Sequence, residues 1–293
     1  MHVKLGFNKK MTNENNPWKY VARRDVSNNP YFKKETQEAK ADDTLPEEKK
    51  QDFNIPASSK IDGTYQFIED NPYAKTVHEL QKTLTANSNN THPFIKDKNT
   101  KIYRPLTFKE NIEAKINNYE TLNTPNNTPR SDEEREKLFK VYLDSCTGIA
   151  YQKGTTKFKI NPVCEELITI DKKFKDEFKT IDFASFAGFA LDSKDDIYNK
   201  LLTKNQFLNH RAYNALFNND ASLMNNYWSI VNKLTKKDNL MAFWVRQNTS
   251  KDELRALCVD SLGGNSVAVG NVSLDDFARF LLVAPSQKKS GKK

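Results

Sequence analysis

The feature that most constrains the fold of this chain is the helical spacing of apolar residues between Thr107 and Pro285. In this stretch, apolar side chains recur at intervals of three and four residues, which is the spacing of one face of an α-helix. Several segments also begin with Ser or Thr followed three residues later by Glu, a capping box typical of helix N-termini. The clearest boxes begin at Thr107, Ser131 and Ser250. The sequence therefore predicts an all-α fold.

We expect a compact multi-helix domain of about eight helices in residues 106–284, with almost no strand. The brief alternation in Thr155–Ile160 fits either a short strand or an extended link. The apolar run Leu240–Val245 is predicted to be a buried helix. Further helices are predicted to begin at Pro162, Ser250 and Ser273. The helix at the centre of this prediction is Lys204–Asn219. Its apolar face holds Leu208, Ala212, Ala215 and Leu216, and its polar face holds Lys204, Arg211, Asn214 and Asn218.

Residues 1–105 are predicted to form a long, largely extended N-terminal arm. Prolines at positions 17, 30, 46, 56, 72 and 93 interrupt this region at intervals too short for long helices, although Val77–Leu84 fits one short helix. The run Lys33–Asp52 is rich in mixed charge and cannot bury enough surface to offset the entropy of ordering. Spaced aromatic residues nevertheless suit docking on the core or on a neighbouring copy of the chain. The candidate assembly residues are Trp18, Tyr20, Tyr31 and Phe32.

The net charge of +8 and the pI of about 9.1 favour a polyanionic partner. Half of this net charge lies in the last six residues, which carry four lysines and no acid. The sequence thus predicts a basic C-terminal tail over residues 285–293. Such a tail either binds the partner or only keeps the chain in solution.

The sequence lacks the short motifs of common catalytic, cofactor and metal sites. It has no glycine-rich phosphate loop, no His-Glu-x-x-His zinc motif and no Gly-x-Ser-x-Gly nucleophile. The cysteines, Cys146, Cys164 and Cys258, lie on apolar segments where a thiol is usually inert. Acid-x-Lys triplets such as Glu177-Phe-Lys179 fit a solvated helix face. We therefore expect no enzyme, cofactor or metal, and, without a signal peptide or membrane span, a cytoplasmic protein that binds no membrane.

Binding is the remaining class of function, because cations and aromatic residues lie close together in the C-terminal half. Arginine and lysine neutralise phosphates, and planar side chains stack on unpaired bases. Arg211 and Arg246 adjoin strongly apolar sequence, so each is expected to need an anionic partner, either a ligand or an internal carboxylate. The candidate nucleic-acid contacts are Lys204, Arg211, Asn214, Asn218, Lys233, Lys236, Arg246 and Arg255.

The combination of helical core, aromatic arm and basic tail is similar in layout to the RNA-coating proteins of some filamentous or negative-strand RNA viruses. The leading hypothesis is a self-assembling structural protein that coats single-stranded nucleic acid, with RNA favoured over DNA. Its copies would associate through the arm, and it would reside in the virion. The alternative hypothesis is a cytosolic protein-interaction or scaffold module with no nucleic-acid role.

Overall fold

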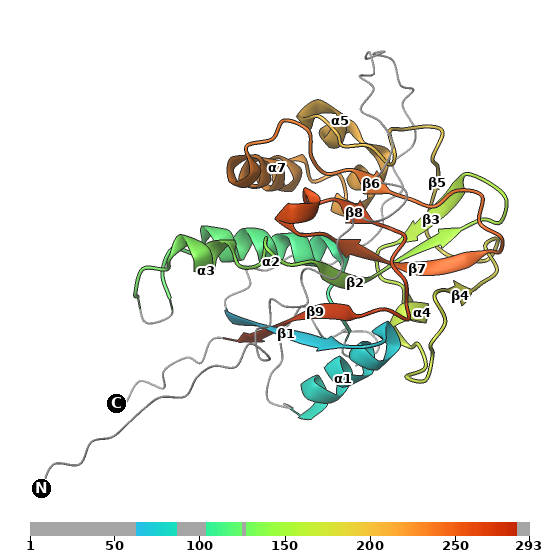
Figure 1. The fold of residues 1–293 in the computed structure, drawn as a ribbon, viewed down its shortest axis with the longest axis horizontal. Helices are drawn as coiled ribbons and strands as arrows, with labels where there is room; N and C mark the ends of the chain where they lie inside the picture. Colours follow the sequence, from blue (N-terminus) through green and yellow to red (C-terminus); the bar gives the residue numbers. More distant parts are fainter. Residues whose placement is uncertain (1–62, 87–103, 125–126, 286–293) are drawn as a thin grey trace, which may run out of the picture. The chain divides into compact units, whose positions relative to one another are not determined.

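Strand β2 (Leu143–Tyr151) lies at the centre of the fold in a computed structural model that describes residues 63–86, 104–124 and 127–285. It pairs antiparallel with β3 (Lys157–Asn161) on one side and with β7 (Glu253–Val259) on the other. The remaining strands of this sheet are β4 (Lys179–Thr180), β5 (Phe189–Asp192), β6 (Phe243–Trp244) and β8 (Ala268–Val269). The sheet is curled and has the order β5–β3–β2–β7–β8–β6, with β4 also paired to β7 (Figure 1).

A second, two-stranded sheet joins the two ends of the described region. Strand β1 (Gly63–Asp70) pairs antiparallel with β9 (Ala278–Pro285) along their full lengths. An ion pair of 2.8 Å between Arg279 Nη2 and Glu69 Oε2 links the same two strands. The backbone N–H of Arg279 also donates to Asp144 Oδ2 at 2.7 Å, which ties the small sheet to β2.

Helix α1 (Tyr73–Ala86) packs against the small sheet and is part of the core. Tyr73 contacts the Phe280 ring edge-on, with centroids 5.2 Å apart, and its hydroxyl donates to the Ser145 carbonyl. The predicted short helix at Val77–Leu84 is therefore confirmed and extended. Packed structure begins within the region predicted as an arm, whereas the assembly residues Trp18, Tyr20, Tyr31 and Phe32 lie outside the described residues, as do residues 286–293.

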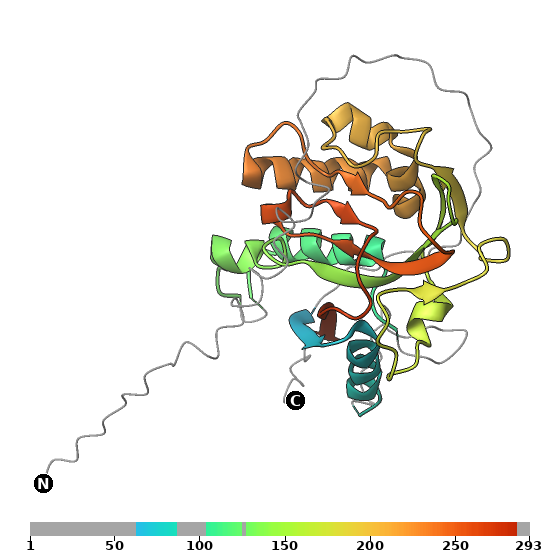
Figure 2. The ribbon, with the colours of Figure 1, turned by 45° about the vertical axis from the view of Figure 1, so that its right-hand side comes forward.

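Helices α2 and α7 lie on one side of the curled sheet, and α1 with the small sheet lies on the other (Figure 1 and Figure 2). The helices that follow α1 in the chain are α2 (Phe108–Glu120), α3 (Asp132–Glu136), α4 (Glu165–Ile168), α5 (Lys204–Asn209), α6 (Arg211–Phe217) and α7 (Ala221–Thr235). Within the described ranges, none of these helices has the length and apolar character that a bilayer crossing requires.

Two of the three predicted capping boxes are confirmed. Thr107 and Glu110 cap α2 reciprocally, and Ser131 and Glu134 do the same for α3. The Asp220 side chain accepts the Leu223 N–H at the start of α7, where a helix is also predicted. At these three positions the capping side chains predicted from the sequence lie at the N-termini of helices.

The all-α prediction is wrong, because the fold is mixed α and β. Residues 143–151, 253–259 and 278–285 form the strands β2, β7 and β9 instead of the predicted helices. Every residue of β2 and β7 is buried, so these strands lack the alternation of apolar and polar residues that identifies a half-exposed strand. Leu240–Val245 is buried as predicted but contains β6, and Pro162 precedes only the one-turn helix α4. Of the two alternatives for Thr155–Ile160, a short strand or an extended link, the structure shows the strand, β3.

The predicted helix Lys204–Asn219 is divided into α5 and α6 at His210. This residue has an extended backbone, with φ −70° and ψ 122°, so it interrupts the helical path. Its buried ring lies 2.8 Å from the Ile197 carbonyl oxygen through Nε2 and stacks on Phe243. Burial of this ring in the aromatic core therefore outweighs helix continuity.

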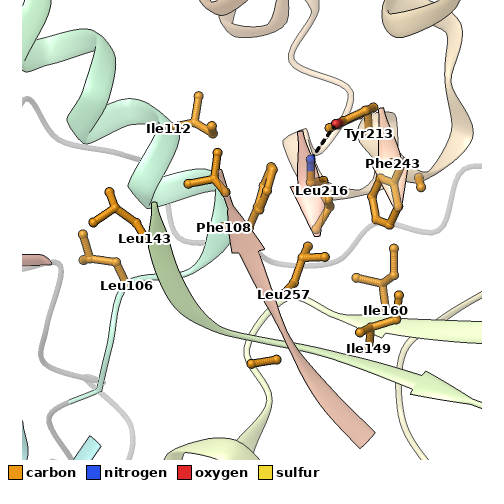
Figure 3. Packing of buried hydrophobic residues seen from close by; sticks show 14 of the residues in the cluster. Leu106, Phe108, Ile112, Leu143, Ile149, Ile160, Tyr213, Leu216, Phe243 and Leu257 are labelled. Atoms are coloured by element: carbon orange, nitrogen blue, oxygen red, sulfur yellow. Dashed lines mark hydrogen bonds between the residues drawn. The ribbon is translucent and has the colours of Figure 1, made fainter. Parts of the chain in front are cut away.

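The main core lies between the sheet and the helices α2, α6 and α7. Phe108, Tyr213 and Phe243 contribute rings to it, and Ile149 and Leu257 project from β2 and β7 (Figure 3). The Tyr213 hydroxyl, although buried, donates to the Ala242 carbonyl and accepts the Ala268 N–H. A buried hydroxyl with both kinds of partner carries little desolvation penalty, so it can fix β6 and β8 against α6.

Candidate functional site

The residues predicted to contact nucleic acid do not form one surface stripe. Lys204 begins α5, Arg211 begins α6, and Asn218 ends α6 in a left-handed conformation. The Asn214 amide donates to the Leu208 and His210 carbonyls and so serves the junction between the two helices. Lys233 and Lys236 lie at the C-terminal end of α7.

Arg246 and Arg255 are brought together, and they share two carboxylates. Glu253 Oε1 lies 3.1 Å from Arg246 Nε and 3.2 Å from Arg255 Nε. Glu177 Oε1 lies 3.2 Å from Arg246 Nη1 and 2.8 Å from Arg255 Nη2. Each glutamate therefore holds both guanidinium groups through a single oxygen. We refer to these four residues as the arginine–glutamate cluster.

The arginine–glutamate cluster has a buried floor and a partly exposed rim. The side chains of Arg255 and Glu253 are 0% and 3% exposed, whereas those of Arg246 and Glu177 are 31% and 52% exposed. Arg246 and Glu177 are thus accessible to solvent. The other pair is held in the protein interior, where an unpartnered charge would be strongly destabilising.

Strand β7 positions the floor of the cluster. Glu253 and Arg255 are two residues apart on this strand, so their side chains project from the same face. Arg255 Nη1 donates to the Val272 carbonyl at 3.3 Å, and the Phe178 ring lies 5.3 Å from its Cζ. Backbone and aromatic contacts therefore fix Arg255 independently of the two glutamates.

Loops position the rim of the cluster. Arg246 follows β6, and Glu177 lies in the loop just before β4. The Glu177 carbonyl accepts the Leu274 N–H at 2.8 Å, which holds the backbone of this loop. The side chain of Glu177 reaches the cluster from the solvent side, and its Oε1 atom contacts both arginines.

The arginines set the ionisation of Glu177. Partial burial by itself would raise the pKa of this carboxyl group, but the hydrogen bonds and positive charges of Arg255 and Arg246 outweigh burial and hold its pKa below the ordinary value. At neutral pH Glu177 is therefore an anion that is paired with two guanidinium groups.

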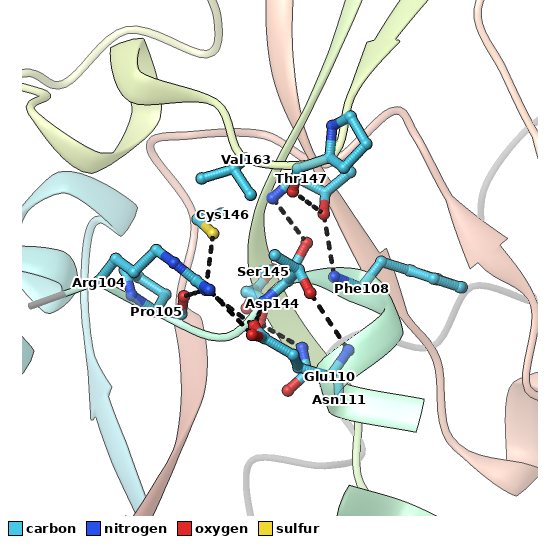
Figure 4. Close-up of polar contacts among 12 residues, drawn as sticks. Arg104, Pro105, Phe108, Glu110, Asn111, Asp144, Ser145, Cys146, Thr147 and Val163 are labelled. Carbon is cyan, nitrogen blue, oxygen red and sulfur yellow. Dashed lines mark hydrogen bonds and ion pairs between the residues drawn. The ribbon is translucent and has the colours of Figure 1, made fainter. Parts of the chain in front are cut away.

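A second polar cluster serves the fold. Arg104 contacts both Glu110 oxygens, at 2.8 and 2.9 Å, and also lies near Cys146 Sγ (Figure 4). These groups and the Thr147 hydroxyl, which accepts the Phe108 N–H, join the first turn of α2 to β2. All of them are buried, so we assign this cluster to stability.

The cysteines do not provide an activated nucleophile in the described structure. All three are buried and free of disulfides. Burial raises the pKa of the Cys146 thiol to about 11 and raises that of Cys164 as well. The buried His210 ring contacts Tyr198, Tyr213 and Phe243.

Among the described residues, no three His, Cys, Asp or Glu side chains are grouped so that they could hold a metal ion.

Sequence reasoning identified both arginines of the cluster but neither glutamate. It assigned Glu253 to a helix cap and Glu177 to a solvated helix face. Of the two partners considered for Arg246, an internal carboxylate is the one that the structure shows. The alternation Glu253-Leu-Arg255 could have identified Glu253 as a partner of Arg255, because in a strand it places two opposite charges on one face.

Comparison with known proteins shows similarity at the level of fold. No known protein family and no curated protein matches the sequence. A solved structure described as "Accommodation of massive sequence variation in Nanoarchaeota by the C-type lectin fold" is similar, with a TM-score of 0.52 and 15% sequence identity. The similarity covers 77% of this chain and 100% of that one. The chain thus has a fold similar to the C-type lectin fold.

This fold overturns the hypothesis of a viral nucleocapsid or filament-coat protein, which rested on an all-α core. The alternative of a scaffold module gains no support from the comparison. Three of the cations proposed for RNA binding, Arg211, Arg246 and Arg255, lie in internal ion pairs. A nucleic-acid partner and self-association through the arm stay predictions.

Proposed function

We propose that this chain is a non-catalytic ligand-binding protein whose recognition centre is the arginine–glutamate cluster. The observation that carries this proposal is the convergence of two guanidinium groups on one solvent-exposed carboxylate, Glu177. Guanidinium groups fixed in this way bind anionic ligands with directional, charge-assisted hydrogen bonds.

The fold supports the proposal in a second way. The similar Nanoarchaeota structure is described as accommodating massive sequence variation on the C-type lectin fold. In this chain, β7 supplies the buried half of the cluster and loops supply the exposed half. A scaffold of this kind allows the exposed half to change while the core is preserved, which suits recognition of a ligand.

A thermal-shift screen of the full chain against soluble acidic, neutral and basic compounds tests this function. A ligand that binds only the folded state raises Tm, and the stabilisation grows with the logarithm of the ligand concentration once this exceeds Kd. We expect acidic compounds to raise the Tm of the wild type, and the Arg246→Gln substitution to remove this effect. Arg211→Gln is the matched control, because the Arg211 side chain is 32% exposed and pairs with the exposed acid Asp195. Shifts that are equal for both variants, or the absence of any shift with acids, would contradict the proposal.

A further inference from the structure

Two ion pairs at the surface of this protein are nearly identical in geometry but differ in what lies beneath them. Arg246 and Glu177 are 3.2 Å apart, with side chains 31% and 52% exposed. Arg211 and Asp195 are 3.3 Å apart, with side chains 32% and 53% exposed. Only Glu177 also contacts a fully buried guanidinium, that of Arg255.

We propose that Glu177 occupies a carboxylate-binding site of this protein and that the carboxylate of a ligand displaces it. This inference rests on the proposed function and names the chemistry of its ligand. The Glu177 carboxylate stands for the ligand carboxylate, since it accepts one N–H from each arginine. Glu177, in the loop before β4, therefore competes with the ligand carboxylate for the same two arginines.

The exchange conserves charge and hydrogen bonds. When a ligand carboxylate takes the place of Glu177, one carboxylate replaces another and both N–H donors keep an anionic acceptor. The released Glu177 side chain, already half exposed, is hydrated by solvent. Glu253 is not exchanged, because its side chain is only 3% exposed and contacts both arginines at the buried end of the cluster.

The remaining contacts of Arg255 keep the site formed while Glu177 is away. Its Nε contacts Glu253, its Nη1 donates to the Val272 carbonyl, and its guanidinium lies against the Phe178 ring. These contacts leave Nη2 directed at the position of the Glu177 oxygen. A preformed donor of this kind binds an incoming carboxylate without first having to be ordered.

Removal of the competitor provides the test, with Glu177→Ala compared to the matched variant Asp195→Ala. The probe is sodium propionate, which carries the same carboxylate as a glutamate side chain, and sodium chloride at equal ionic strength is the salt control. We expect propionate to bind Glu177→Ala at least about 10-fold more tightly than the wild type, since one charge-assisted hydrogen bond corresponds to a change of that size. Binding is measured from the rise in Tm with ligand concentration.

The outcome that would overturn the site is an equal response of Glu177→Ala and Asp195→Ala to propionate, or an equal response of Glu177→Ala to chloride. If Glu177→Ala does not fold in plain buffer, recovery of its folding by propionate but not by chloride supports the site. In that case Glu177→Gln, which keeps the shape of the side chain without its charge, provides the titration. A propionate affinity of Glu177→Gln no higher than that of the wild type counts against the site.

A second probe separates two sources of the carboxylate. Glucuronate binding more tightly than propionate indicates an acidic sugar, and the reverse indicates a free organic acid. The site and the proposed function can also fail separately. If propionate binds Glu177→Ala but no acidic compound stabilises the wild type, the site is present and the recognition function is refuted.

Discussion

Replacing Lys115 by methionine removes an ammonium group that is completely buried in α2. Its Nζ donates to the Val141 carbonyl at 2.9 Å and to the Asp260 carbonyl at 3.4 Å. Burial lowers the pKa of Lys115 from 10.5 to about 8, although Cys258 and Asp260 oppose the shift. This difference corresponds to about 3 kcal/mol of unfavourable free energy for the charged form in the folded protein.

The sign of the pH dependence follows from the two states. The folded protein releases the Lys115 proton near pH 8, where its pKa lies, whereas the unfolded chain releases it near pH 10.5. Between these values the unfolded state binds more protons, so the contribution of Lys115 to stability rises with pH by up to about 1.4 kcal/mol per pH unit. The Lys115→Met variant lacks this titration.

Urea denaturation of both proteins at pH 7, 8, 9 and 10, followed by circular dichroism, measures the effect. The free energy of unfolding of the wild type minus that of Lys115→Met should be constant below pH 8 and increase by about 2–3 kcal/mol by pH 10. Tyrosines and cysteines of the unfolded chain also titrate in this range, but both proteins carry them, so their contributions cancel in the difference. A difference that stays flat from pH 7 to pH 10 would refute the reasoning.

Two further predictions concern the core. Gly148→Ala places a methyl group 2.6 Å from Cys164 Sγ, so we expect it to lower the free energy of unfolding by about 1–3 kcal/mol in urea denaturation. The control Gly263→Ala, whose methyl group would meet nothing closer than 3.5 Å, should lower it less. Equal losses for the two variants would contradict the clash. Burial lowers the pKa of His210 despite the opposing charge of Asp196, so the unfolded chain is protonated first as the pH falls below about 6.5. The wild type should therefore lose up to about 1.4 kcal/mol per pH unit relative to His210→Gln between pH 6.5 and 5, and parallel stability curves would exclude this effect.

Helix starts were predictable from the sequence because they depend on residues close together in the chain. The boxes at Thr107 and Ser131 cap real helices, since each side chain reaches an N–H three residues away. The same pattern at Ser250 precedes β7, where Glu253 instead pairs with Arg246 and Arg255. A capping box permits a helix but does not enforce one when a buried strand forms more contacts.

The strand pairing could not be predicted by the same reasoning. The partner of β1 lies more than 200 residues away, at Arg279 opposite Glu69, and nothing near either residue identifies the other. Both β2 and β7 are covered on both faces, so their apolar residues follow no period of two. In the arginine–glutamate cluster, the two arginines were predictable from the sequence and the two glutamates were not. An arginine in apolar sequence indicates a need for an anion, but which glutamate supplies it depends on the fold.

The energetics of the cluster explain how such a site can exchange its occupant. An exposed pair such as Arg211–Asp195 contributes about 0–1 kcal/mol, so its acid can leave at little cost. Arg255 is fully buried and keeps Glu253 when Glu177 leaves, so it loses one charge-assisted hydrogen bond, at a cost of about 1.5–3 kcal/mol. The state with a carboxylate on Arg255 therefore dominates, and the contest is between Glu177 and the ligand. Because Glu177 lies in a loop and Arg255 in β7, substitutions in the loop can tune ligand affinity while the buried half of the site is preserved.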